Sequence, residues 1–142
     1  MIVAVNFTKI CAEKKPAQIQ KLNINNNIRI TSVEEAKIEV KPGDSALKII
    51  FEFESNYEPE IANLKIVGEA IDVEDKKNAK TILNDWTKNK KISENFLTDI
   101  MNVILSKCNV EAILLSKELN LPPPLPMPRV GTKKKDENNY IG

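Results

Sequence analysis

The chain has 142 residues, of which 21 are lysine or arginine and 20 are aspartate or glutamate, so its formal net charge is +1. This length is enough for one domain with a buried core. The near balance of charge gives no overall field that would attract nucleic acid or an anionic membrane. Only Arg29 and Arg129 carry the guanidinium group that is common in phosphate recognition. Nucleic acid therefore ranks low among the expected partners.

Histidine is absent, and the two cysteines, Cys11 and Cys108, lie far apart. The chain thus lacks the spacing of zinc and haem sites, and neither thiol has an imidazole to activate it. The 4 glycines form no phosphate-binding loop. We therefore expect no metal, no cofactor and no enzymatic activity. The opening "MIVAVNFTK" is too short for a membrane span and has no basic leader of a signal peptide, so it reads as a strand. Together with the two distant cysteines, this favours a reduced, cytoplasmic protein.

Alternating apolar residues predict the first two strands. Val3, Val5 and Phe7 have the period of a half-buried strand, which extends toward Ala12. After the charged, proline-containing stretch 12–18, the "NNN" at 25–27 predicts a turn, because asparagine tolerates the left-handed conformation. The alternation restarts at Ile28 and is expected to continue through residues 36–40. Pro42 and Gly43, in "KPGD", then predict a turn.

The clearest element is "ALKIIFEFE" at 46–54, which places apolar residues on one face and charged residues on the other. A turn at 55–60 leads to a fourth strand from Ala62 to Val73, in which Gly68 indicates a bulge or close backbone packing. Short turns between successive strands predict an antiparallel meander.

The apolar period changes from two residues to that of a helix after Asp75. "DKKNAKTILNDWTKNK" predicts an amphipathic helix, in which Trp86 is expected to belong to the core. Ser93 is a candidate cap for a second helix that continues toward Asn120. This second helix is apolar around much of its circumference, so we expect it to contact a second surface, which could be the first helix, the proline segment or another subunit.

Together these patterns predict an α+β domain in which a four-stranded antiparallel meander sheet is followed by two helices on one face. Residues 1–130 form the single domain, and residues 131–142 are expected to be a flexible polar tail. A light-scattering mass above that of the monomer, most simply that of a dimer or tetramer, is the expected sign of self-association.

The segment "LNLPPPLPMP" at 119–128 must run extended, because proline neither continues a helix nor joins a sheet interior. In one interpretation Pro123 to Pro126 is a PxxP ligand for a partner's aromatic groove. In the other, the segment packs on the protein itself and buries Leu121, Leu125 and Met127. We favour self-packing, because no flexible spacer separates the segment from the helix before it.

Two other features are candidates for contact with a partner. Tyr57 is expected inside a turn, where little would bury it, so it is a candidate binding residue. Lys133 to Lys135 could contact RNA, although Asp136 and Glu137 balance the run and favour a solubilising tail.

The order of elements resembles that of the SecB-type export chaperones. "NFTKICAEKKP" is similar to the first strand of that family and its exit, and "NNNIRITSV" to its second strand. "ALKIIFEFESN" followed by "IANLKIVGEAIDV" resembles the central hairpin, and "LNLPPPLPMP" the apolar segment after the main helix. The resemblance covers Asn6 to Pro128.

The resemblance implies a non-enzymatic chaperone, a dimer or tetramer that holds unfolded polypeptide clients in apolar grooves. Two alternatives remain open at this point. One is an RNA- or ribosome-associated factor that uses the lysine-rich tail, and the other is an interaction module that presents the proline-rich ligand. The salt dependence of binding distinguishes the chaperone from the RNA-associated factor. RNA binding is expected to fall steeply as ionic strength rises, whereas binding of an apolar client persists.

Overall fold

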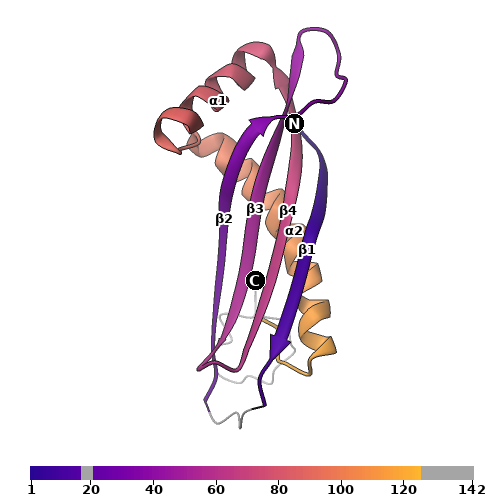
Figure 1. Ribbon diagram of the computed structural model, residues 1–142, viewed down its shortest axis with the longest axis vertical. Helices are drawn as coiled ribbons and strands as arrows, with labels where there is room; N and C mark the ends of the chain where they lie inside the picture. The colour runs from indigo at the N-terminus through magenta and orange to yellow at the C-terminus, as the bar shows by residue number, and fades with distance from the viewer. Residues whose placement is uncertain (17–20, 126–142) are drawn as a thin grey trace, which may run out of the picture.

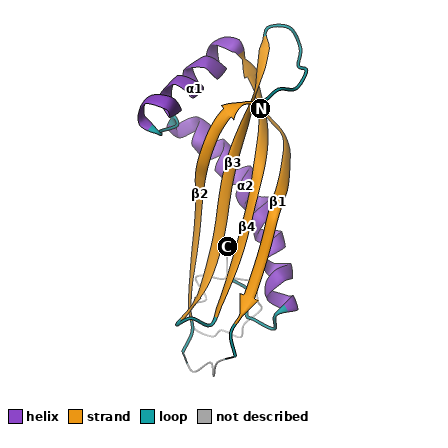
Figure 2. Cartoon of the chain, viewed as in Figure 1, coloured by secondary structure: helices purple, strands orange, loops and turns teal. Residues whose placement is uncertain are grey.

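The computed structural model describes residues 1–16 and 21–125 as a sheet backed by helices (Figure 1). Its elements in chain order are β1 (Ile2–Lys14), β2 (Asn23–Glu35), β3 (Asp44–Glu58), β4 (Ala62–Asp75), α1 (Lys76–Asn89) and α2 (Glu94–Glu118). All strand pairs are antiparallel, and both helices follow the sheet in sequence (Figure 2). The predicted α+β class, with four antiparallel strands and then two helices, is confirmed.

The strand order is β1-β4-β3-β2, which differs from a simple meander. β2, β3 and β4 are neighbours in sequence order, as expected, but β1 pairs with β4 instead of β2. The physical reason lies in the connections. A tight turn at 59–61 holds β3 beside β4, whereas β1 and β2 are joined by the longer stretch 15–22, which does not force them to pair.

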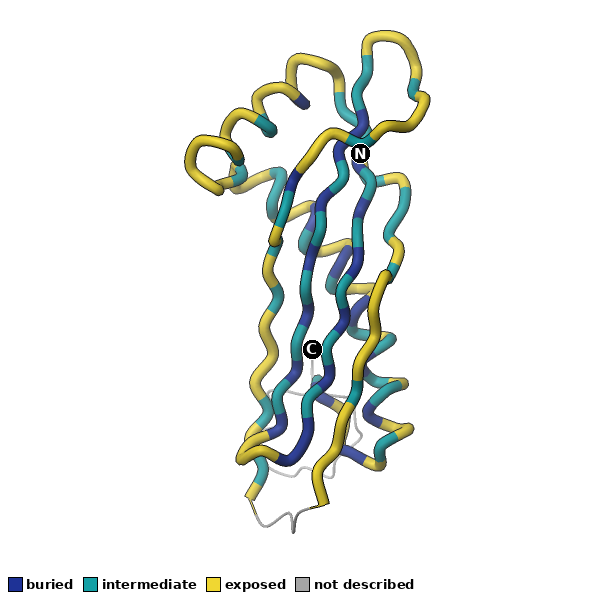
Figure 3. The backbone as a smooth tube through the Cα atoms, viewed as in Figure 1, coloured by how far each residue is buried: buried dark blue, intermediate teal, exposed yellow. Residues whose placement is uncertain are grey.

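One face of the sheet carries the core. On β3 the side chains of Leu47, Ile49, Phe51 and Phe53 are at most 1% exposed, while the residues between them are half-buried (Figure 3). The other face bears the charged residues, as the alternation predicted. There the Glu52 carboxylate lies 3.0 Å from the Lys65 ammonium and 3.3 Å from the Arg29 guanidinium. The hydrogen bond from Lys65 lowers the pKa of Glu52.

Three features of the strands differ from the predicted ones. The turn predicted at 25–27 was wrong, because these asparagines lie within β2 and pair with β3, whose ladder outweighs their turn preference. β2 ends at Glu35 and does not continue through Val40. The Ala36 amide makes a last bond to the Ala46 carbonyl at 2.8 Å, and residues 37–41 then leave the ladder before the turn at 42–43. Gly43 has a φ of 93°, a conformation that glycine adopts without strain. β3 runs to Glu58, so the turn predicted at 55–60 is confined to 59–61.

The two helices begin differently. The Asp75 side chain caps α1 by accepting a 2.8 Å bond from the Asn78 amide. The prediction that Ser93 caps α2 was wrong for its side chain, which makes no capping hydrogen bond. Its carbonyl instead accepts the first helical bond, from the Leu97 amide.

α2 runs along the sheet and contributes the helical part of the core (Figure 1). Ile100, Ile104, Cys108 and Ala112 recur at every fourth position and are fully buried. Burial raises the pKa of Cys108 to about 12, in keeping with the core position predicted for this thiol. Ile82, Leu83 and Trp86 of α1 pack against the same core cluster, so both helices contact one face of the sheet.

The proline segment turns back onto the sheet after α2. Leu121 is 6% exposed and belongs to the core, and its amide donates to the Ser116 carbonyl at 2.8 Å. The Tyr57 hydroxyl donates to the Pro122 carbonyl at 2.6 Å. The self-packing interpretation therefore holds for residues 121–125. Met127, Pro126 and the predicted tail at 131–142 lie outside the described residues.

Neither helix in the described part of the chain combines the length and the apolar character that a membrane span requires.

Candidate functional site

An apolar groove lies where α1, α2 and the β2 edge of the sheet meet. Its volume is about 340 Å³, and its lining consists of Ile30, Trp86, Lys90, Lys91, Ile92, Leu97 and Met101. The five apolar members are all half-buried, so each presents part of its side chain to the groove. β2 is an edge strand, which leaves one of its sides free of strand partners among the described residues.

The turn between the helices builds one wall of the groove. α1 ends at Asn89, and Lys90 takes the left-handed conformation with a φ of 54°, while its amide donates to the Trp86 carbonyl. This C-terminal cap reverses the chain within residues 90–93. Ile92 thereby comes to the groove between Trp86 of α1 and Leu97 of α2.

Lysines form the polar rim of the groove. The Lys90 ammonium lies 5.3 Å from the centre of the Trp86 ring, a distance at which the ring face attracts a cation. Lys91 also lines the groove, and Lys88 lies in the last turn of α1. None of these three lysines has an ion-pair partner within the described part of the chain.

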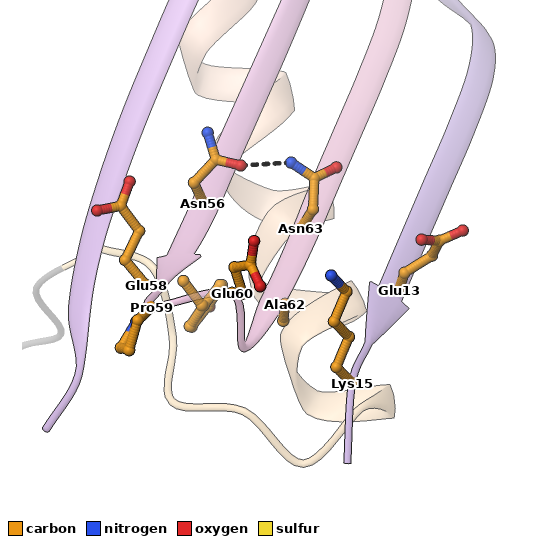
Figure 4. Close-up of a pocket in the computed structure, with 9 residues that line it drawn as sticks. Glu13, Lys15, Asn56, Glu58, Pro59, Glu60, Ala62 and Asn63 are labelled. Carbon is orange, nitrogen blue, oxygen red and sulfur yellow. Dashed lines mark hydrogen bonds between the residues drawn. The ribbon is translucent and has the colours of Figure 1, made fainter. Parts of the chain in front are cut away.

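A second pocket, of about 390 Å³, surrounds the β3–β4 hairpin and the end of β1 (Figure 4). Its lining is mainly polar and includes Glu13, Glu58, Glu60 and Lys15. Asn63 donates to both Asn56 and Glu54, which fixes the amide at the pocket floor. No cluster of three or more potential metal ligands occurs in residues 1–16 and 21–125. This pocket is larger than the groove, and it differs from the groove in that four of its lining residues carry a charge, three of them negative.

Tyr57, Leu121 and Leu125, the predicted site residues that the structure describes, lie at the hairpin end of the sheet and are not part of the groove lining. Tyr57 is on β3 and is 1% exposed, so the expectation that it lies in a turn was wrong. Burial raises the pKa of Tyr57 to about 12, because the phenolate would lose its hydration. The Tyr57 hydroxyl donates to the carbonyl of Pro122, the residue after Leu121. Leu125, further along the same segment, is half-buried. A role for these residues in binding a partner stays a prediction, and Met127 is not among the described residues.

Sequence reasoning missed the groove because its members come from three elements. Trp86 was assigned to the core, yet it is only half-buried and lines the groove. Two sequence signals pointed in this direction. The second helix has more apolar surface than one sheet covers, and the single tryptophan of the chain is followed closely by three lysines.

Comparison with known proteins gives a structural match. No family model and no curated protein matches the sequence. The structure is similar to that of a SecB-like chaperone from Mycobacterium tuberculosis, solved in complex with a ChAD peptide from the HigA1 antitoxin. The TM-score is 0.50 at 14% identity, and the match covers 92% of this chain and 90% of that chain. The chain therefore has a SecB-like fold, in agreement with the resemblance in the order of its elements.

Proposed function

We propose that this chain is a non-enzymatic, chaperone-like protein that binds extended, unfolded polypeptide segments in the groove between β2, α1 and α2. The observation that carries the proposal is the groove itself, whose half-buried apolar residues come from three elements and leave a volume of about 340 Å³. Apolar clefts with a few polar groups at the rim are the usual sites for ligands. An extended segment in this groove would also lie beside the edge strand β2, whose backbone groups can pair with it.

The comparison supports this proposal through the fold. The M. tuberculosis protein with the same fold was solved with a bound peptide. The alternatives from the sequence have weaker support. The lysine run proposed to contact RNA lies outside the described residues. The described part of the proline-rich segment is packed on the chain's own sheet, with Leu121 buried. Tyr57 and Leu121 therefore enter the proposal as residues that hold the proline segment on the sheet, and contact of these two residues and Leu125 with a partner stays a prediction.

Replacing Leu97 and Met101 together by alanine is expected to weaken the binding of an apolar peptide about tenfold. Fully burying one such side chain is worth about 1.5 to 3 kcal/mol, and these two side chains are already half-buried. Fluorescence of Trp86, the single tryptophan, measures the affinity directly. The matched control is Ile38→Ala, because Ile38 is 50% exposed and lies outside the groove. Equal affinities in all three proteins would argue against this groove as the binding site.

Suppression of aggregation tests the chaperone activity itself. A denatured test protein is diluted from urea with and without the chain, and light scattering is followed over time. We expect suppression at stoichiometric amounts of the folded chain, and persistence of the effect at high salt, because apolar contacts are not screened. No suppression at any ratio would remove the chaperone interpretation. An activity abolished by moderate salt would favour the RNA-associated alternative.

We also propose that the chain self-associates through α2. Val103, Val110 and Leu114 are 41%, 61% and 52% exposed, and their spacing of seven and four residues places them on one side of the helix. Exposed apolar surface of this kind is typical of subunit contacts. Light scattering is expected to give the mass of a dimer or tetramer for the parent chain. The double variant Val110→Glu, Leu114→Glu is expected to be monomeric, while Asn84→Glu on the exposed side of α1 keeps the parent mass.

A further inference from the structure

The rim of the groove is positively charged, and no carboxylate in the described part of the chain pairs with this charge. Lys90 and Lys91 follow α1 and line the groove, and Lys88 lies in the last turn of α1. Ion pairs do occur elsewhere in the described residues, for example between Lys65 and Glu52 at 3.0 Å. Lys88, Lys90 and Lys91 have no ion-pair partner within residues 1–16 and 21–125. Their ammonium groups are therefore not neutralised by a described carboxylate and can pair with a negatively charged ligand.

The negative side chains closest in sequence do not neutralise this rim. Glu94 begins α2, where the positive end of the helix dipole stabilises its carboxylate, and it is not part of the groove lining. Asp85 and Asp99 are exposed on their helices and are likewise absent from the lining. The groove thus combines an apolar floor with a cationic edge.

The position of the Lys90 ammonium defines how the two parts act together. It lies 5.3 Å from the centre of the Trp86 ring, so the charge is held directly beside the apolar floor. The left-handed conformation of Lys90 fixes its backbone, and its amide bond to the Trp86 carbonyl ties the lysine to the end of α1. A carboxylate next to an apolar side chain could pair with the ammonium while that side chain enters the groove.

We propose that the groove selects extended polypeptide segments in which an apolar residue is flanked by acidic residues. This inference rests on the proposed function, because it specifies the class of segment that the same groove would bind. A free phosphate group would satisfy the lysines but would leave the floor of Ile30, Trp86, Ile92, Leu97 and Met101 uncovered. A wholly apolar segment would cover the floor and leave the lysines without partners. An acidic and apolar peptide satisfies both.

Three short peptides with one shared apolar core and flanks of glutamate, serine or lysine test the proposal on the full chain. Trp86 fluorescence is expected to give the tightest binding for glutamate flanks and the weakest for lysine flanks, with a difference of about fivefold at low salt. The difference is expected to shrink as ionic strength rises, while the affinity for the serine-flanked peptide stays nearly constant.

Charge reversal provides the matched comparison. The double variant Lys90→Glu, Lys91→Glu is expected to invert the order and prefer lysine flanks. The variant Lys77→Glu, Lys80→Glu makes the same change of charge on exposed positions of α1 outside the groove lining, and it is expected to keep the parent order. Lys91→Glu alone retains the contact between Lys90 and Trp86 and is expected to reduce the preference without inverting it.

The outcomes separate this inference from the proposed function. Equal binding of the three peptides would overturn the acidic preference and leave peptide binding intact. No response of Trp86 to any of them would overturn both. A response to single-stranded RNA with none to the glutamate-flanked peptide would assign the lysines to phosphate recognition, and would also overturn the inference.

Discussion

Ending the chain at Asn120 is expected to lower the melting temperature by about 10 °C relative to the full chain. The truncation removes Leu121, which is 6% exposed and whose burial is worth about 1.5 to 3 kcal/mol. It also removes the Pro122 carbonyl, which accepts the 2.6 Å bond from Tyr57. Loss of such a bond to a buried hydroxyl costs about 1 kcal/mol or more. Thermal unfolding followed by circular dichroism measures the change.

A second polar contact adds to the effect of this truncation. The Asn26 amide donates to the Pro124 carbonyl at 2.8 Å, and its oxygen accepts from the Ser55 hydroxyl at 2.7 Å. Ser55 is fully buried, so this chain of bonds connects the core to the proline segment. Proline carbonyls are suitable acceptors at these positions, because a proline has no backbone N–H that would itself need a hydrogen-bond partner.

A chain ending at Val130 is the control for this truncation. It keeps every contact of Leu121, Pro122 and Pro124 that the structure describes, and it is therefore expected to melt like the full chain. Full-length Leu121→Ala and Pro123→Ala form a second matched pair, because Leu121 is buried and Pro123 is exposed. If both truncated chains were as stable as the full chain, the segment would contribute nothing to stability. The interpretation of Pro123 to Pro126 as a ligand for a partner would then be favoured over self-packing.

The parts of the fold that could be predicted are those that depend on the local spacing of apolar residues. The alternation of Leu47, Ile49, Phe51 and Phe53 identified both the strand and its buried face. The change of period at Asp75 located the start of α1, where the same residue provides the cap. These signals depend only on neighbours in the sequence, so they remain valid whatever the tertiary arrangement is.

The parts that could not be predicted depend on contacts between distant residues. The pairing of β1 with β4 joins Val5 to Ala70 and is not encoded in either strand alone. Tyr57 was expected in the turn predicted at 55–60, but it lies on β3, and its hydroxyl donates to the Pro122 carbonyl, 65 residues later in the chain. The groove likewise depends on how Ile30, Trp86 and Met101 meet. The apolar surplus of the second helix indicates that a further contact exists, but it does not identify the other two elements.

Gly68→Ala is expected to destabilise the fold by about 1 to 3 kcal/mol, and Gly68→Val by more. A β-carbon at this position would lie 2.5 Å from the Asn6 carbonyl oxygen of β1 and 2.6 Å from the Cζ atom of Phe51. The strand β4 has β1 on one side and β3 on the other, so the added atom meets backbone and a core ring at once. Urea unfolding with an unchanged m value measures the loss of stability.

The sequence predicted this restriction at Gly68 as either a bulge or close backbone packing. The structure has the close approach at Gly68, while the register shift falls opposite it on β1, between Phe7 and Lys9. Phe7 and Phe51 lie on either side of the glycine in an edge-to-face pair with ring centres 6.5 Å apart. A side chain on Gly68 would therefore disturb an aromatic contact in addition to the strand spacing.

A double-mutant cycle separates the two causes of the expected loss at Gly68. Phe51→Leu removes the Cζ atom that a new β-carbon would meet and leaves the Asn6 carbonyl in place. If the ring clash dominates, Gly68→Ala is expected to cost clearly less in the Phe51→Leu background than in the parent chain, with a coupling of about 1 kcal/mol. Additive costs would assign the loss to the β1 backbone. No loss from Gly68→Ala in either background would contradict the close approach of β1, β3 and β4 on which the packing of this face depends.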